Sequence, residues 1–197
     1  LGVHEAWTFS GAEQYMVPDR MYQVPINWDM AEQTRGKYTM LRAWDTNAAL
    51  VRNHGGQLIL TVKMAPDWAK AWDQKNSPPK PEYYADYARF CQMVIDRYHP
   101  WAIELWNEPD MQRSKVENPA ENNWYGAWVD DIAGETWEQG GTRYGECMRL
   151  VTEQVTGAKI IIGALTSHQF SIRFLQAAFA AGMGGDALSY HCYVPYS

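Results

Sequence analysis

The chain has 197 residues, a formal net charge of −6, 46% hydrophobic residues and 20% charged residues. This size and balance predict one globular domain over residues 1–197 and argue against a disordered chain. The acidic charge, without any run of Lys or Arg, argues against nucleic acid or an anionic membrane surface as a partner. The first residues, Leu1 to Glu5, show neither region of a signal peptide, so a secreted and a cytoplasmic location both stay open.

Strand-like and helix-like segments alternate along the chain. The apolar runs predict strands at 2–7, 21–28, 57–64, 101–106, 159–165 and 187–193. Helical spacing of apolar residues predicts helices at 38–53, 81–98, 142–156 and 171–181. A polar, Trp-rich loop insertion separates the fourth strand from the third of these helices, over about 111–141.

Continuous apolar strands separated by amphipathic helices predict a parallel α/β sheet covered by helices. A doubly wound sheet and a (β/α)₈ (TIM) barrel both fit this pattern. No Gly-rich phosphate loop follows the first strand, and polar or aromatic residues follow most strands, which favours the barrel and its single mouth.

The predicted strands number six, where a closed barrel has eight and about 250 residues. We therefore expect an incomplete barrel of about six βα units, either a fragment or a chain that closes by pairing with another chain. Open sheet edges favour association, so a homo-oligomer formed through these edges is a further expectation.

One eight-residue run carries the clearest chemical signal. The apolar strand that contains Ile103 and Leu105 stops at Asn107 and Glu108, and Pro109 then turns the chain away. A carboxyl group at the end of a buried strand, beside an amide, is placed to face a pocket. The competing interpretations are that Glu108 is a solvated turn residue and that Asn107 is only a turn former.

Metal and cofactor signals are weak. The three cysteines, Cys91, Cys147 and Cys192, have neither the spacing of a metal site nor that of a disulfide framework. The residues His4, Glu5, His168 and His191 would share a barrel mouth, as in metal-dependent barrel hydrolases, but they lack the close spacing of known His motifs. We predict no metal and no cofactor, and keep a metal-dependent barrel hydrolase as an alternative.

Four motifs in chain order resemble those of the clan A glycoside hydrolases, which are retaining (β/α)₈ enzymes, with families 39 and 5 the most similar. The motifs are Asn27-Trp28 with Gly36-Lys37-Tyr38, then Pro66-Asp67-Trp68, then Trp106-Asn107-Glu108-Pro109, and last His191-Cys192-Tyr193. Together they extend over nearly the whole chain and correspond to the second, third, fourth and sixth strands of the barrel.

The resemblance implies a role for each matching residue. Glu108 would be the general acid/base, and Asn107 would bind the sugar 2-hydroxyl. The remaining predicted substrate-binding residues are His191 and Tyr193, which would line the subsite next to the cleaved bond, Trp68 and Trp28 of the wall, and His168 and Trp124 of the loops. Trp128 and Trp137 of the insertion are further candidates for stacking on sugar rings, and His168 is equally compatible with a plain loop.

Two positions depart from the clan pattern. Gln23 stands about where the clan has an arginine, and the nucleophile, a glutamate at the end of the seventh strand, has no counterpart after the sixth predicted strand. We therefore predict a retaining glycoside hydrolase for β-linked oligo- or polysaccharides whose nucleophile is absent from this chain. A catalytically impaired carbohydrate-binding barrel scaffold is the main alternative.

Overall fold

The computed structural model describes residues 4–5, 16–113, 127–166 and 169–191, with the backbone alone for residues 4–5. Six strands of this part form one parallel sheet in the order β1-β2-β3-β4-β5-β6. The strands are β1 His4–Glu5, β2 Met21–Asn27, β3 Gln57–Lys63, β4 Ala102–Asn107, β5 Lys159–Leu165 and β6 Ala187–Tyr190. Because neighbours in space follow the order in the chain, the sheet has the connectivity of a barrel wall.

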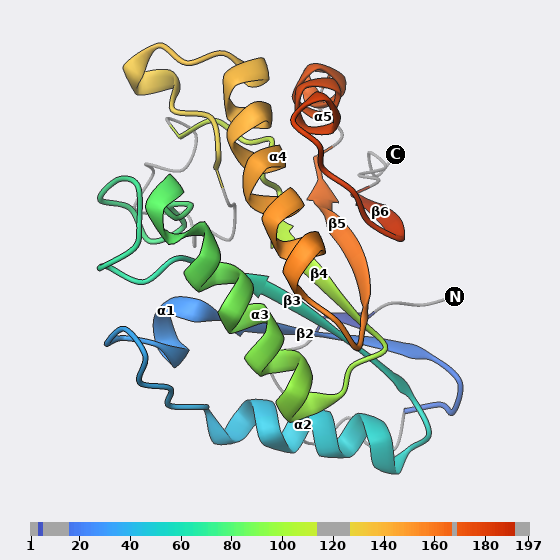
Figure 1. Ribbon diagram of the computed structural model, residues 1–197. Helices are drawn as coiled ribbons and strands as arrows, with labels where there is room; N and C mark the ends of the chain where they lie inside the picture. The colour runs from blue at the N-terminus through green and yellow to red at the C-terminus, as the bar shows by residue number, and fades with distance from the viewer. Residues whose placement is uncertain (1–3, 6–15, 114–126, 167–168, 192–197) are drawn as a thin grey trace, which may run out of the picture.

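Helices cover one face of this sheet (Figure 1). The α-helices are α1 Trp28–Ala31, α2 Arg42–Asn53, α3 Tyr84–Tyr98, α4 Trp137–Gln154 and α5 Ser171–Ala180, and two short 3₁₀ helices are η2 Pro81–Tyr83 and η4 Asp131–Ala133. No helix of the described ranges is long and apolar enough to cross a membrane. The predicted fold class, a partial TIM barrel of about six βα units, is confirmed by this arrangement.

The two faces of the strands differ in polarity. Val24, Leu60 and Leu105 belong to the core that β2, β3 and β4 share with the helices. On the opposite face, the amide of Gln23 donates to Thr61 Oγ1 at 2.6 Å and to Glu104, and Thr61 Oγ1 donates to Glu104 Oε2 at 2.8 Å. The inner face of the arc therefore holds a hydrogen-bonded polar cluster, which the continuous apolar runs alone did not predict.

Several predicted boundaries were wrong by a few residues. Helix α4 begins at Trp137 rather than at Thr142, because Thr136 and Gln139 form a capping box in which each side chain bonds the other's backbone N–H. The insertion is correspondingly shorter than 111–141. Helix α2 begins at Arg42 rather than at Tyr38, and β6 ends at Tyr190 rather than at Tyr193.

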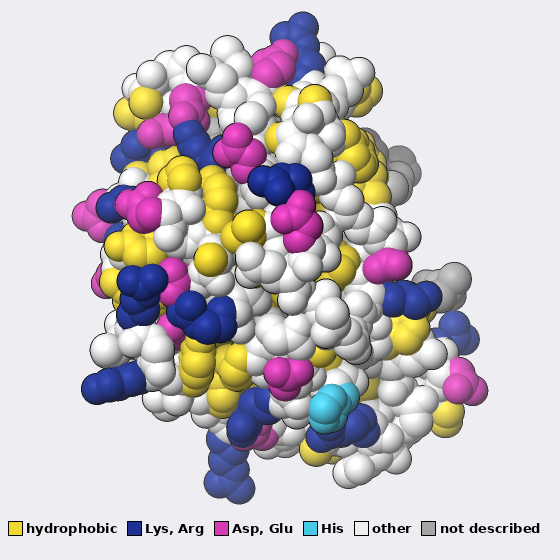
Figure 2. Space-filling model, in the orientation of Figure 1, with side chains coloured by type: hydrophobic (Ala, Val, Ile, Leu, Met, Phe, Trp, Pro, Cys, Tyr) yellow, Lys and Arg dark blue, Asp and Glu magenta, His cyan; other side chains and the backbone are white. Residues whose placement is uncertain are grey.

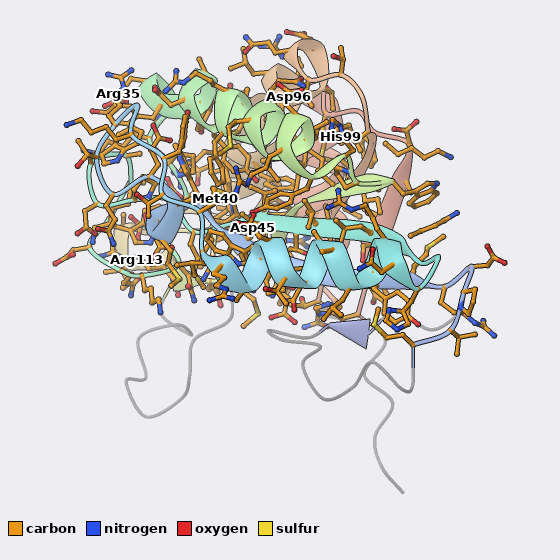
Figure 3. The ribbon with its side chains drawn as sticks, turned by 90° about the horizontal axis from the view of Figure 1, so that it is seen from below. Arg35, Met40, Asp45, Asp96, His99 and Arg113 are labelled. Atoms are coloured by element: carbon orange, nitrogen blue, oxygen red, sulfur yellow. The ribbon has the colours of Figure 1, made fainter. Side chains whose placement is uncertain are left out.

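The basic and acidic side chains of the helix layer are interspersed, as Figure 2 shows for this face. Helix α3 is joined to α2 through Asp45, which Figure 3 labels on α2. Asp45 accepts from the Arg97 guanidinium at 2.9–3.0 Å and from the Tyr98 hydroxyl at 2.9 Å. Tyr98 is buried, and this burial is the main reason that its pKa is raised to about 12. At the other end of α3, the buried Asp86 carboxylate forms ion pairs with Arg35 and Arg89.

Glycine permits the close approach of α4 and α5. A Cβ on Gly141 would lie 2.2 Å from the Phe174 carbonyl oxygen, and one on Gly145 would lie 2.4 Å from that of Ala178. Both contacts are with backbone, which cannot rotate out of the way. The two helices can therefore pack at this distance only while these two positions lack a side chain.

Gly145→Ala is expected to lower the free energy of unfolding by about 1–3 kcal/mol, because overpacking outweighs the gain in helix propensity. The measurement is urea denaturation followed by circular dichroism. Gly184→Ala is the matched control, since nothing lies within 4 Å of its added Cβ. Equal stability of the two variants would show that α4 and α5 are not closely packed at Gly145.

Asp86→Asn is expected to lower the free energy of unfolding by about 1 kcal/mol at pH 7, a value reduced by the exposure of its arginine partners. Burial alone would raise the pKa of Asp86, but Arg35 and Arg89 together lower it. A lowered folded-state pKa gives stability that is present above the unfolded pKa of about 3.9 and is lost as pH falls through the folded value.

The difference between Asp86→Asn and the wild-type chain should therefore begin to shrink below about pH 5, roughly one pKa unit above the unfolded value, and should go on shrinking as the pH falls through the lowered folded-state pKa. Asp96→Asn, on the exposed side of the same helix, is the control and should change little at any pH. A difference that stays constant with pH would contradict the ion-pair account of Asp86.

Candidate active site

The turn after β4 holds Glu108 in an unusual backbone conformation. Trp106 has φ of 75° and Glu108 has φ of 49°, both in the left-handed region that side-chain-bearing residues rarely adopt. The Glu108 N–H donates to the Ala164 carbonyl at 2.7 Å, which ties the turn to the end of β5. Strained backbone of this kind persists only where the surroundings impose it, and it concentrates at functional sites.

The Glu108 side chain contacts His191. Glu108 Oε1 lies 2.7 Å from His191 Nδ1, and the side chains are 2% and 32% exposed, so the carboxyl group is enclosed while the imidazole reaches solvent. The His191 N–H donates to the Leu165 carbonyl at 2.8 Å. The structure thus brings two predicted site residues, 83 positions apart, into direct contact across the end of β5.

A row of polar residues ends three neighbouring strands. Asn27, Lys63 and Asn107 are the last residues of β2, β3 and β4, and their exposed fractions are 1%, 3% and 8%. Asn27 and Lys63 are also aligned in the register of the sheet. Sequence analysis did not identify Lys63 as a candidate site residue. The available signal was its spacing: Lys63 lies two residues after Thr61, so both side chains point to the same face of the strand.

A further carboxyl group beside this row is that of Asp29, in the short helix α1 that directly follows Asn27. The Asp29 N–H donates to the Met64 carbonyl at 2.9 Å, which fastens α1 to the end of β3. Burial raises the pKa of Asp29, and the charge of Lys75 partly offsets this. Asp29 and Lys75 therefore add one acidic and one basic group to the β2–β3 side of the mouth.

The aromatic wall differs from its prediction. Trp68 is half-buried, and its indole N–H donates to the Glu32 carbonyl at 2.8 Å. Its ring lies edge-on to that of Trp28, with 5.4 Å between the ring centroids. Trp28 itself is 0% exposed and is enclosed by the core rings, including Phe90 at 5.9 Å. The prediction that Trp28 contacts a sugar was wrong: it supports Trp68 from behind.

Two tryptophans of the predicted insertion are structural. Trp128 is 0% exposed and packs edge-on against Trp106 at 5.3 Å, so its predicted stacking on sugar rings was wrong. Trp137 is part of α4, donates its indole N–H to the Asp110 carbonyl at 3.2 Å and packs on Phe170 at 4.4 Å. Both rings hold the loop after β4 in place.

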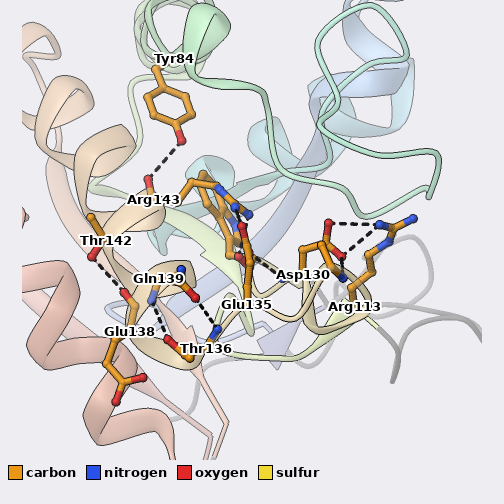
Figure 4. A network of polar contacts seen from close by, with 11 residues as sticks. Tyr84, Arg113, Asp130, Glu135, Thr136, Glu138, Gln139, Thr142 and Arg143 are labelled. Carbon is orange, nitrogen blue, oxygen red and sulfur yellow. Dashed lines mark hydrogen bonds and ion pairs between the residues drawn. The ribbon is translucent and has the colours of Figure 1, made fainter.

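The same loop is fastened by ion pairs, which Figure 4 shows together. Arg113 pairs with Asp130 at 3.0 Å, and Arg143 of α4 pairs with Glu135. Both guanidinium groups lie 5.5 Å from the Trp72 ring, which belongs to the loop after β3. The loops after β3 and β4 are thus joined at the mouth.

Part of the predicted site lies outside the described residues, namely His168, Tyr193 and Trp124. The side chains of His4 and Glu5 are also outside the described part. Within the described ranges, no three His, Cys, Asp or Glu side chains form a group that could hold a metal ion. The described glutamates after Glu108 are all on loops or on α4 rather than at strand ends: Glu135, Glu138, Glu146 and Glu153.

Comparison with known proteins agrees with this geometry at the level of the fold. No family model and no curated protein matches the sequence. Solved structures do match, and the three described below are glycoside hydrolases. One is a family 30 endoxylanase from Clostridium papyrosolvens C71, with 16% identity, a TM-score of 0.57, and coverage of 88% of this chain and 42% of that one.

Two further matches are similar in extent. A β-galactosidase from Halorubrum lacusprofundi has 13% identity, a TM-score of 0.57, and coverage of 97% of this chain and 39% of that one. A family 5 enzyme from Streptomyces cattleya, in complex with Manβ1-4GlcNAc, has 16% identity, a TM-score of 0.53, and coverage of 88% and 42%. The chain spans about two fifths of these proteins and shares the fold of clan A glycoside hydrolase barrels over that part.

Proposed function

We propose that this chain carries the acid/base half of a retaining β-glycoside hydrolase, with Glu108 as the proton donor. The observation that carries the proposal is the enclosed Glu108 carboxyl group, held at the end of β4 and in contact with His191 at 2.7 Å. A glycosidic oxygen leaves poorly unless an acid protonates it as the bond breaks. Glu108 directly follows Asn107, the last residue of β4, and its buried carboxyl group is paired with the His191 imidazole.

The neighbouring residues supply sugar binding in this proposal. Asn107 binds the 2-hydroxyl, an interaction that strengthens as the transition state forms. His191 bonds Glu108 and lines the same subsite, Trp68 forms part of the wall, and Asn27 and Lys63 offer an amide and an ammonium group to further hydroxyls. Tyr193, His168 and Trp124 stay predictions of the same kind.

The substrate class follows from the likeness of the fold. The similar structures are described as an endoxylanase, a β-galactosidase and an enzyme bound to a β1-4-linked disaccharide. We therefore propose a β-linked oligo- or polysaccharide. We assign no nucleophile within this chain, because none of the described glutamates after Glu108 ends a strand and Glu117 and Glu121 lie outside the described residues.

One observation favours the second candidate, a carbohydrate-binding barrel without turnover. Gln23 stands where the clan has an arginine, and its amide is already engaged with Thr61 and Glu104. The inner face of the arc thus lacks the guanidinium group at this position. The two candidates differ in whether Glu108 can protonate a leaving group, and an added nucleophile makes this measurable.

Formate can serve as that nucleophile. It attacks the anomeric carbon from the face opposite the leaving group, the C–O bond to the phenol breaks, and Glu108 gives its proton to the departing oxygen. We expect formate-dependent release of phenol from a phenyl β-glycoside, and a loss of roughly 100-fold or more in Glu108→Gln. The loss should be much smaller with a 2,4-dinitrophenyl glycoside, whose leaving group needs no proton.

Glu146→Gln is the matched control, since it makes the same chemical change at an exposed position of α4 and should keep the rate. Equal losses on both glycosides in Glu108→Gln would contradict an acid role. If the wild-type chain releases no phenol above the formate blank but binds the saccharide by calorimetry, the binding scaffold replaces the primary proposal.

A further inference from the structure

Asp110 carries a buried carboxyl group two residues after Glu108. The hydrogen-bond donors to this carboxyl group lie outside the loop that follows β4. Asp110 is 2% exposed. It accepts from the Thr166 N–H at 3.0 Å, from the Thr166 hydroxyl at 2.7 Å and from the Ser171 hydroxyl. Burial raises the pKa of Asp110, and the bonds from Ser171 and Thr166 act in the opposite direction. These bonds keep an enclosed carboxyl group satisfied.

The donors belong to the next βα unit. Thr166 directly follows β5, and Ser171 is the first residue of α5. The Asp110 carbonyl also accepts from the Trp137 indole at 3.2 Å. Asp110 is therefore held by residues of α4 and α5 and by the residue that follows β5, all of them outside the turn that contains Glu108.

Three consecutive residues at the end of β5 each hold one part of the site. The Ala164 carbonyl accepts from the Glu108 N–H at 2.7 Å, and the Leu165 carbonyl accepts from the His191 N–H at 2.8 Å. Thr166 then donates to Asp110. Hydrogen bonds to the end of β5 therefore fix the positions of both Glu108 and His191.

We propose that Asp110 is a positioning residue: by fastening the turn after β4 to Thr166 and Ser171, it keeps Glu108 in its left-handed conformation against His191. The conformation of Trp106 and Glu108 is unfavourable by itself, and such backbone needs an imposed restraint. Asp110 provides that restraint from the distal side of the turn, while the bond to Ala164 provides it from the proximal side. The catalytic consequence rests on the proposed function, whereas the restraint itself does not.

Residue-resolved amide hydrogen exchange tests the restraint without any activity. In Asp110→Asn and Asp110→Ala, the Glu108 amide should exchange about tenfold or more faster, because its bond to Ala164 opens more often. The His191 amide, which bonds the neighbouring Leu165, should keep its protection. A general loss of stability would speed both amides equally, so the ratio of the two separates positioning from a structural effect.

Asp130→Asn is the matched control, because it removes a carboxylate bonded to Arg113 in the same loop. It should leave the ratio unchanged. Thr166→Val and Ser171→Ala each remove one hydroxyl donor and should give the same change in smaller amount, which keeps the test decisive if the Asp110 variants fold poorly. Unchanged Glu108 protection in these variants would overturn the proposal.

The formate assay adds the catalytic readout. Asp110→Asn should lose activity on the phenyl glycoside by about tenfold or more and lose less on the dinitrophenyl glycoside, as expected when the acid is misplaced. Faster Glu108 exchange without any turnover in the wild-type chain would reject the proposed function and keep the restraint. Equal losses on both glycosides with normal Glu108 exchange would reject the restraint alone.

Discussion

The attachment of the turn after β4 to the carboxyl end of β5 decides where the Glu108 carboxyl group lies. Parallel strands deliver their carboxyl ends to one edge of the sheet, but this alone does not orient a side chain. Three hydrogen bonds add that orientation. The Glu108 and His191 N–H groups donate to the carbonyls of Ala164 and Leu165. Thr166 donates to the Asp110 carboxylate. Ala164, Leu165 and Thr166 are consecutive, buried residues at the end of β5. The sheet therefore holds the site in a fixed position.

Polarity inside the arc is the second constraint. Gln23, Thr61 and Glu104 satisfy one another in the layer below the mouth, and Asn27, Lys63 and Asn107 end the strands above them. Burying such groups is tolerable only when they are hydrogen-bonded or meet a polar ligand. A polar interior capped by an acid and a histidine suits a ligand rich in hydroxyl groups, which is the chemistry of a saccharide.

The strands, most helices and the position of Glu108 were predictable because apolar runs and their abrupt ends are local signals. Trp28 and Trp128 were misjudged because a single tryptophan gives no sign of whether it faces the core or a cleft; neighbouring elements decide that. Asp110 escaped prediction because its donors Thr166 and Ser171 lie 56 and 61 residues away. The start of α4 was available from the Thr136–Gln139 capping box, which the polar, Trp-rich composition of the insertion obscured.

A crystal structure of Glu108→Gln with a β-linked disaccharide tests the central claim most directly. The account predicts a glycosidic oxygen within hydrogen-bonding distance of the residue 108 side chain, and a sugar 2-hydroxyl bonded to Asn107. The sugar should lie over the carboxyl ends of β2 to β4, beside His191. A disaccharide bound only on the helix-covered face, or with its glycosidic oxygen remote from residue 108, would contradict the account.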